Sequence, residues 1–265
     1  MRIVYLFFML SLVMTACNKK DKEKDPAPTT PIDNGGVDNT PKGTLLVHLH
    51  NYIDETEVDA YNIVYQTSAG RKISLSKGQF YLSDFELVKL DGTTYSVKDK
   101  NILKLQEAES YQLGDVPVGN YKTIRFKVGL SSTVNASTPA ASDLTLNRAD
   151  MWFGSTAQPD GFVFFNFAGK IDTTVAANAP DADMKPFQYR IGTNAQYKQV
   201  VMPDKNYSIV KDQAQYIHMY ANCAKLFDGV TLTNSANLSV ASPADNSSAV
   251  AIKIANNIPN IFVYE

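Results

Sequence analysis

Cysteine, tryptophan and histidine are scarce in this 265-residue chain, which has two cysteines, one tryptophan and three histidines. If Cys17 carries a lipid, Cys223 has no partner for an intramolecular disulfide. The stability of the folded chain must then come from core packing. The formal net charge is −2, and no cluster of Lys and Arg alternates with aromatic residues. We therefore expect no nucleic-acid partner.

The motifs that mark common enzymes are also missing. The sequence has no Gly-rich phosphate loop, no serine set between glycines as in a nucleophile elbow, no His-Glu-x-x-His and no Cys-x-x-Cys. Three histidines would suffice for a catalytic triad, but no Ser or Asp is marked as a partner. We expect a protein that is not an enzyme, and a hydrolase ranks last among the candidate functions.

The start of the chain has the pattern of an export signal. An early positive charge is followed by the apolar run 3–13, which is too short to span a bilayer, and small Ala16 precedes Cys17. Met14 stands where the strict lipobox prefers Leu. We predict a signal peptide and lipobox that end at Cys17, lipidation of that cysteine, and an outer membrane-anchored lipoprotein on the periplasmic or cell-surface face. The alternative is an ordinary secretory signal with a chance cysteine.

A tether follows the signal. Residues 18–43 are rich in charged residues, Pro, Gly, Thr and Asn, so burial cannot offset their ordering entropy. We predict that this segment is disordered and that residues 44–265 form one β-rich domain, a size at which such domains often stay undivided.

Strand-like alternation dominates this domain. In residues 44–50, Leu45, Val47 and Leu49 share one face, and His48 and His50 share the other. The sequence FYLSDFELVKL leads into Asp-Gly, a hairpin signal, and the aromatic run FVFFNF predicts a strand that is buried on both faces. Further predicted strands cover residues 121–128, 187–191, 197–202 and 216–220.

Only two segments have a helical pattern. In residues 248–258, Val250, Ile254 and Ile258 are about one turn apart, and residues 221–227 can form one short turn. Many short strands without βαβ alternation predict an all-β fold, either an antiparallel β-sandwich or a flattened barrel, with one short C-terminal helix.

The histidines are the candidate metal ligands. His48 and His50 lie two residues apart, so both imidazoles project from one face of a strand. Such a pair can chelate a soft or borderline metal if a neighbouring strand supplies a third donor. His218, in another predicted strand, is a candidate for that donor; the alternative is that all three are solvated or hydrogen-bonded strand histidines.

The remaining polar and aromatic groups favour structural roles. Trp152 is interpreted first as a core or rim aromatic residue because its burial contributes strongly to stability. Asp84 and Glu86 are a carboxylate pair on one strand face, but no aromatic platform beside them supports a glycosidase.

The order of several segments resembles the MbnP-like domain, the methanobactin-associated copper-binding protein family. The sequence FYLSDFEL precedes Asp-Gly, and VPVGNY leads to IRFKVGL. Downstream, Leu-Asn and Met-Trp are similar to the family's "PLN…gMxW" segment, GFVF to its "GY" strand, FQYRIG to its "F-x-YHIG" strand, and ANNI with Phe262 to its closing helix. The resemblance covers nearly all of the chain after the tether.

This resemblance implies an exported β-sandwich that binds copper through histidines and an oxidised tryptophan, with a dihaem peroxidase-type protein as partner. It implies a metal site at His50 and Trp152, and the strand pattern adds His48 and His218 as further candidate ligands. Arg190 stands in place of the histidine of "YHIG", and Ala136 stands where some members have another. A guanidinium stays protonated and cannot bind a cation, so we expect Arg190 to lower copper affinity and Arg190→His to strengthen it.

Two functions therefore compete. The first is a copper-binding, lipid-anchored protein with a degenerate site. The alternative is a surface interaction or carbohydrate-binding lipoprotein without metal, which an exposed patch of Tyr52, Tyr61, Tyr65 or Tyr81 would favour.

Overall fold

The computed structural model describes residues 39–154 and 161–265. Cys17, the predicted signal peptide and nearly all of the predicted tether lie outside these residues. Thr40–Glu265 form one compact unit, and only this unit is described below.

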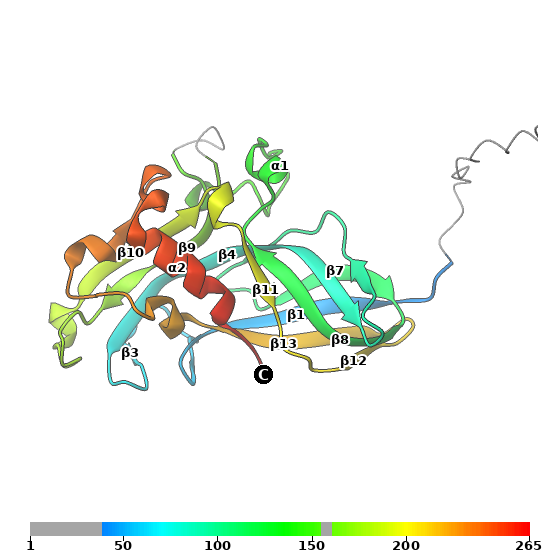
Figure 1. Ribbon diagram of the computed structural model, residues 1–265, viewed down its shortest axis with the longest axis horizontal. Helices are drawn as coiled ribbons and strands as arrows, with labels where there is room; N and C mark the ends of the chain where they lie inside the picture. Colours follow the sequence, from blue (N-terminus) through cyan, green and yellow to red (C-terminus); the bar gives the residue numbers. More distant parts are fainter. Residues whose placement is uncertain (1–38, 155–160) are drawn as a thin grey trace, which may run out of the picture. The chain divides into compact units, whose positions relative to one another are not determined.

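Two curled sheets make up most of this unit (Figure 1). The first sheet has five strands, in the order β15 (Phe262–Tyr264), β13 (Ala214–Asn222), β1 (Lys42–Ile53) and β2 (Thr56–Glu57), with β7 (Ser110–Pro117) also paired with β1. The strands β1 and β13 run parallel, and the other pairs of this sheet are antiparallel.

The second sheet has ten strands. Its main path runs through β11 (Lys198–Val201), β8 (Gly119–Val128), β4 (Lys72–Lys89), β9 (Val163–Ile171), β10 (Lys185–Gly192) and β14 (Ser239–Val240). The short strands β12 (Tyr207–Ile209), which pairs with β8, and β3 (Tyr65–Gln66), β5 (Thr94–Ser96) and β6 (Ile102–Lys104), which pair with β4, complete it. Only β10 and β14 are parallel here, so both sheets are mixed.

One large apolar core lies between the two sheets. It takes Leu45, Val47 and Leu49 from β1, and Phe80 and Phe165 from β4 and β9, all essentially buried. A smaller second cluster includes Tyr81, Trp152, Phe162 and Phe164. Because neighbours such as Phe80 and Tyr81 point to opposite sides of a strand, this second cluster lies on the face of the second sheet that is turned away from the first.

Helical structure is limited to short elements. The helices of the described residues are α1 (Ser132–Asn135) and α2 (Ala249–Asn257), and the 3-10 turns are η1 (Ala149–Met151), η2 (Asp181–Asp183), η3 (Asn194–Gln196), η4 (Cys223–Phe227), η5 (Ser235–Leu238), η6 (Ala244–Ser247) and η7 (Ile258–Asn260). None of these described helices is long and apolar enough to cross a lipid bilayer.

The helix α2 begins and ends where its sequence dictates. The Ser248 side chain accepts a hydrogen bond from the N–H of Ala251 and caps the first turn. Val250, Ala251, Ile254 and Ala255 are buried in the main core, and a 3-10 turn with Pro259 follows. The predicted short C-terminal helix and the all-β class are confirmed, whereas α1 was not predicted.

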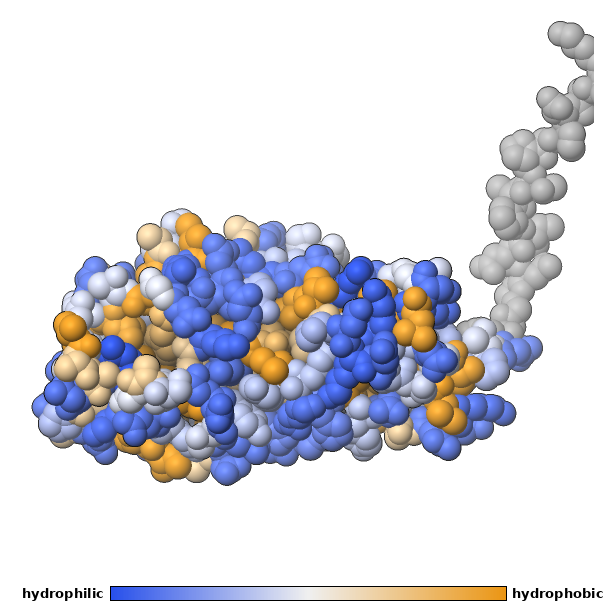
Figure 2. Space-filling view, turned by 60° about the horizontal axis from the view of Figure 1, so that its bottom comes forward, coloured by the Kyte–Doolittle hydropathy of each residue, from blue (hydrophilic) through white to orange (hydrophobic). Residues whose placement is uncertain are grey.

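The outer surface of this unit offers no large apolar area on the face drawn in Figure 2. Hydrophilic residues cover most of that face, and apolar residues form small, separate groups. Scattered exposed apolar side chains are normal for folded proteins.

Candidate metal centre

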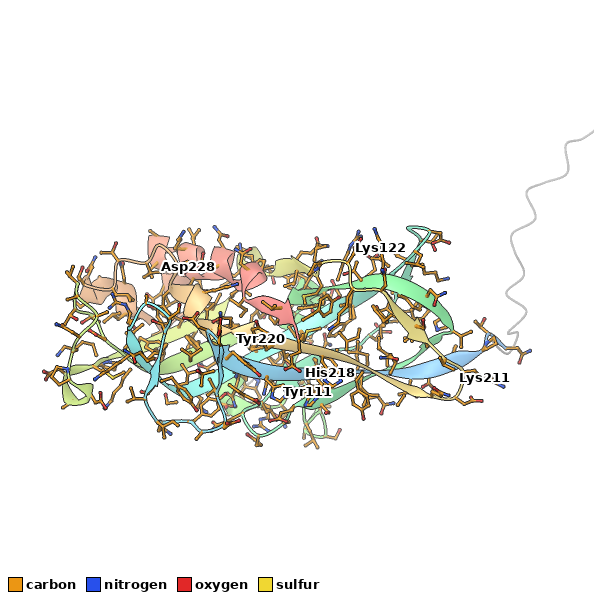
Figure 3. The ribbon with its side chains drawn as sticks, turned by 90° about the horizontal axis from the view of Figure 1, so that it is seen from below. Tyr111, Lys122, Lys211, His218, Tyr220 and Asp228 are labelled. Carbon is orange, nitrogen blue, oxygen red and sulfur yellow. The ribbon has the colours of Figure 1, made fainter. Side chains whose placement is uncertain are left out.

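All three histidines lie on the outer face of the first sheet. Residues of β1 alternate strictly between buried and partly exposed, so Leu49 and Asn51 point into the molecule while His48 and His50 point out. In the parallel register, His218 of β13 lies opposite His48, and Tyr220 lies opposite His50. Figure 3 shows His218 and Tyr220 on this side of β13. We call this surface the histidine face.

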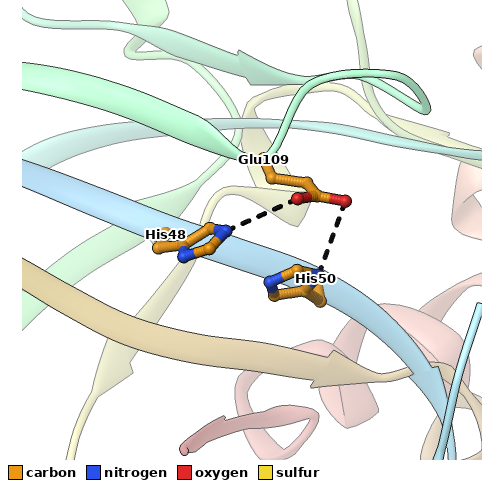
Figure 4. A group of neighbouring side chains, drawn as sticks. All are labelled: His48, His50 and Glu109. Carbon is orange, nitrogen blue, oxygen red and sulfur yellow. Dashed lines mark hydrogen bonds and ion pairs between the residues drawn. The ribbon is translucent and has the colours of Figure 1, made fainter. Parts of the chain in front are cut away.

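Glu109 completes a group of three metal-type donors with His48 and His50 (Figure 4). One carboxylate oxygen of Glu109 lies 3.5 Å from His48 Nε2, and the other lies 3.7 Å from His50 Nδ1. One donor atom from each residue fits within 4.8 Å of the others. Two imidazole nitrogens and a carboxylate oxygen therefore converge on one small volume.

The backbone of β1 holds Glu109 in this place. The carbonyl of Glu109 accepts a 2.8 Å hydrogen bond from the N–H of Leu49, the residue between the two histidines. The loop before Glu109 is held from the core side of the sheet, because the Tyr111 hydroxyl donates to the carbonyl of Ala108 at 2.6 Å. The side chain of Glu109 is thus directed at the histidines by its own main chain.

A buried lysine holds the same loop. Lys104 is 2% exposed, and its Nζ donates to the carbonyls of Leu105 and Ala108 at 2.6 and 2.8 Å. Burial lowers the pKa of Lys104 to about 8, although Glu109 and other acidic groups nearby oppose the shift. Lys104 therefore links the core beneath the sheet to the loop that carries Glu109.

The other side of the β1 strand is anchored through Asn51. Its Nδ2 donates to the carbonyl of Gly78 at 2.9 Å and to the Tyr61 hydroxyl at 2.8 Å. A Cβ atom on Gly78 would lie 2.8 Å from that amide nitrogen, so a larger residue at this position would displace the Asn51 side chain. The contact fixes β1 between His50 and Tyr52.

Further donors surround this group. Glu57 contacts His50 Nδ1, and Glu265 lies 3.9 Å from His50 Nε2 and 3.8 Å from His218 Nδ1. Within the described part of the chain, the ion pairs of Glu57, Glu109 and Glu265 are all with histidines.

The electrostatic effect of these carboxylates reaches the neighbouring tyrosine. The pKa of Tyr52 is raised, first by burial and then by the negative charges of Glu57 and Glu265. Tyr52 packs against Tyr220 with ring centroids 4.4 Å apart. Such a negatively polarised site favours a bound cation.

Trp152 lies elsewhere, and the prediction that it joins His50 in one site is wrong. It belongs to the second core cluster, is 9% exposed, and its indole nitrogen donates to the carbonyl of Leu146 at 3.0 Å. This cluster is on the far face of the second sheet, whereas the histidines are on the far face of the first. Both sheets and the main core separate the two, and the structural interpretation of Trp152 is the one observed.

Arg190 is beside Trp152 and not beside the histidines. Its side chain donates to the carbonyl of Trp152, and its guanidinium carbon lies 5.4 Å from the centre of the Phe153 ring. Burial lowers the pKa of Arg190 from its ordinary value. The expectation that Arg190 adds positive charge next to an ion bound by His50 is therefore corrected.

The other residues considered from the sequence have structural partners. Glu86 pairs with Arg125 and Asp84 with Lys127, both at 3.1 Å, so the carboxylate pair is neutralised. Of the tyrosines whose exposure would favour the metal-free alternative, Tyr65 and Tyr81 are buried, whereas Tyr52 and Tyr61 are partly exposed. Cys223 is a free buried thiol, and burial raises its pKa to about 12, so it is unsuited to ligation.

The sequence alone did not identify Glu57, Glu109 and Glu265 as residues of the site. Glu57 could have been found, because β2 folds back on β1 through a short turn and pairs Glu57 with Tyr52. Glu109 lies in the loop just before β7, and Glu265 comes just after β15, where no periodic pattern marks a side chain as facing the histidines.

The donor set suits a borderline divalent cation. Imidazole nitrogen is a ligand for copper, zinc and nickel, and a site of nitrogen and carboxylate oxygen favours Cu(II) over the softer Cu(I). His50 has 12% and His48 27% of its side chain exposed, and Glu109 53%, so the site is open to an ion from solvent. The residues present therefore fit copper in its divalent state.

The model of the MbnP family matches residues 42–244. Among solved structures, MbnP from Methylosinus trichosporium is 14% identical, with 71% of this chain and 78% of that chain covered and a TM-score of 0.46. No curated protein matches. The family match contains His48, His50, Glu109 and His218, whereas Glu265 lies beyond it.

Proposed function

This chain belongs to the MbnP family, and we propose that it binds a copper ion on the histidine face through His48, His50 and Glu109. The observation that supports this most is the convergence, within 4.8 Å, of two imidazole nitrogens from strand β1 and a carboxylate from the loop before β7. Residues on regular strands hold ligand geometry more precisely than residues on loops.

The hydrogen bond behind His48 supports the same site. Its Nδ1 lies 3.2 Å from Nδ1 of His218, so when the Nε2 of His48 binds the ion, Nδ1–H can donate to His218. A metal-binding histidine usually donates its other ring N–H in this way, which fixes its tautomer and ring orientation.

We further propose that the protein is exported and anchored to the outer membrane through a lipidated Cys17. The apolar segment and Ala16 before this cysteine support export. The tether would then hold the metal-binding unit away from the lipid surface. The membrane is the partner that this arrangement requires, and a dihaem peroxidase-type protein is a second proposed partner.

Calorimetric titration with Cu(II) tests the metal proposal. Wild-type protein should bind copper, and His50→Ala should lose that binding, since His50 contributes the least exposed donor. Glu55→Gln is the matched control: Glu55 is an exposed carboxylate next to β2 that is not part of the donor group. Equal binding by wild type and His50→Ala would contradict the site, and equal loss in Glu55→Gln would show a nonspecific charge effect.

Exposed tyrosines on the histidine face support a second candidate function, the binding of a carbohydrate or a partner protein without metal. Tyr216 is 42% exposed, and the paired rings of Tyr52 and Tyr220 lie on the same histidine face, with His218 between Tyr216 and Tyr220 along β13. A row of tyrosines beside a strand can stack on a carbohydrate ring or a partner protein. This metal-free interaction function takes the lead if wild-type protein binds no copper.

A further inference from the structure

A groove lies between β12 and β13, where an edge of the second sheet meets an edge of the first (Figure 1). Its volume is about 420 Å³. Residues 205–208 and 210 line it from the side of β12, and residues 215–218 line it from the side of β13. Tyr264, at the end of β15, also lines this groove.

Both strands have an unpaired edge at this groove. In the described part of the chain, β12 pairs with β8 alone. The strand β13 pairs with β1 over its whole length, but on its other side β15 pairs only with residues 219–221. The N–H of Glu265 adds one hydrogen bond to the carbonyl of His218. Among the described residues no strand continues β15 along residues 214–217, and such an open edge is a template for a further strand.

The main chain of Tyr216 points into the groove. Residues of β13 direct their main-chain groups alternately to β1 and to the opposite side. The carbonyl of His218 and the N–H of Asn222 bond on the side of β15, so Tyr216, two positions before His218, directs its N–H and carbonyl to that side as well. The Tyr216 carbonyl accepts a 3.0 Å hydrogen bond from Nε2 of Gln215. A side-chain amide thus occupies the position that the N–H of a further strand would take.

The lining indicates which kind of segment fits. Val210 and Tyr216 are 47% and 42% exposed, so an apolar side chain can pack on them. The Nζ of Lys205 lies 4.9 Å from the centre of the Tyr264 ring and donates to the main-chain oxygen of Glu265 at 2.6 Å. The carboxylate of Glu265 is turned toward the histidines, and among the described residues no carboxylate lines the groove. The charge of Lys205 therefore favours an acidic ligand.

We propose that this groove binds an extended, acidic peptide segment of a partner protein, which adds as a strand to the edge of β13 in line with β15. Main-chain hydrogen bonds with Tyr216 hold the segment, as in other cases of strand addition to a sheet edge. An apolar side chain of the segment packs on Val210 and Tyr216, and a carboxylate pairs with Lys205. The inference goes beyond copper binding and does not depend on it, because the proposed copper ligands do not line the groove.

The test is selection from a library of random peptides displayed on phage, followed by calorimetry with a synthetic copy of the most enriched peptide. Enriched peptides should alternate apolar and acidic residues. Tyr216→Pro removes the N–H that points into the groove and leaves the bonds to β1 in place, so it should bind about 2–10-fold more weakly than Tyr216→Ala, which keeps that N–H. Lys205→Gln should also weaken binding, whereas Lys185→Gln, at an exposed lysine of β10, is the control and should not. Circular dichroism and thermal unfolding verify that each variant is folded.

Three results would overturn this proposal. The first is that folded wild-type protein enriches no peptide, or enriches basic ones. The second is equal binding by Tyr216→Ala and Tyr216→Pro, which would mean that side chains alone hold the ligand and that no strand is added. The third is a dimer in analytical ultracentrifugation that Tyr216→Pro dissociates, which would mean that a second copy of this chain occupies the groove.

Discussion

His48 and His218 face each other across the parallel strands β1 and β13, with their Nδ1 atoms 3.2 Å apart. The two residues are 170 positions apart in the chain. Two imidazole nitrogens at this distance need one proton between them, so one ring donates and the other accepts. This pair sets the orientation of His48, and through it the position of the donor atom that faces Glu109.

Removing the partner ring should lower the copper affinity without abolishing copper binding. His218→Ala leaves Nδ1 of His48 without its partner, and loss of such a supporting hydrogen bond typically lowers metal affinity about 10–100-fold. Copper titration of folded wild type and His218→Ala measures the change. Unchanged affinity would show that the His48–His218 contact has no part in metal binding.

Replacing the tryptophan should leave metal binding unchanged. Trp152→Phe removes the hydrogen bond from the indole to Leu146 and reduces the volume of the second core cluster, so stability should fall by about 1–3 kcal/mol. Denaturant unfolding measures the stability, and copper titration measures the site. A large loss of copper affinity in the folded variant would contradict the separation of Trp152 from the histidine face.

Stability should depend on pH through Lys104. Burial lowers its folded-state pKa to about 8 from the ordinary 10.5, so between these values the unfolded chain holds a proton that the folded chain does not. The free energy of unfolding should therefore rise with pH in this window. Below about pH 8 Lys104 is protonated in both states, and the free energy of unfolding no longer changes with pH because of it.

The variant Lys104→Met removes that contribution. The stability difference between wild type and Lys104→Met should shift in favour of wild type by roughly 1–2 kcal/mol from pH 8 to pH 10. Lys98→Met, at an exposed lysine, is the control and should show no such shift. A constant difference across the window would mean that Lys104 stays charged when buried.

Membrane attachment should depend on one sulfur atom. Cys17→Ser removes the acceptor of the lipid and leaves the apolar signal intact, so lipid labelling and processing to the mature chain should stop. Labelling with a palmitate analogue in cells checks this. Undiminished labelling would overturn the proposed lipid anchor.

Local periodicity predicted the part of the site that lies on one strand. The alternation in residues 44–50 placed Leu45, Val47 and Leu49 inside and both histidines outside, as observed. The Asp-Gly turn and the helix before Pro259 were equally local signals. The fold class followed from such patterns because each strand must bury one face.

The rest of the site depends on pairings between distant segments. Nothing in the local sequence states that β13 pairs in parallel with β1, which brings His218 next to His48. Trp152 was misplaced for a related reason: its segment follows the family order, but that order does not state which face of which sheet the side chain reaches. The carboxylates came from strand ends and loops, where the period-two pattern stops.

The most direct test of the metal centre is the electron paramagnetic resonance spectrum of the protein with one equivalent of Cu(II), recorded for wild type and His50→Ala. The structure predicts nitrogen hyperfine coupling from two imidazoles in wild type and its loss in His50→Ala, with Trp152→Phe unchanged from wild type. A wild-type spectrum without imidazole coupling, or one that His50→Ala leaves unaltered, would contradict a copper site on the histidine face.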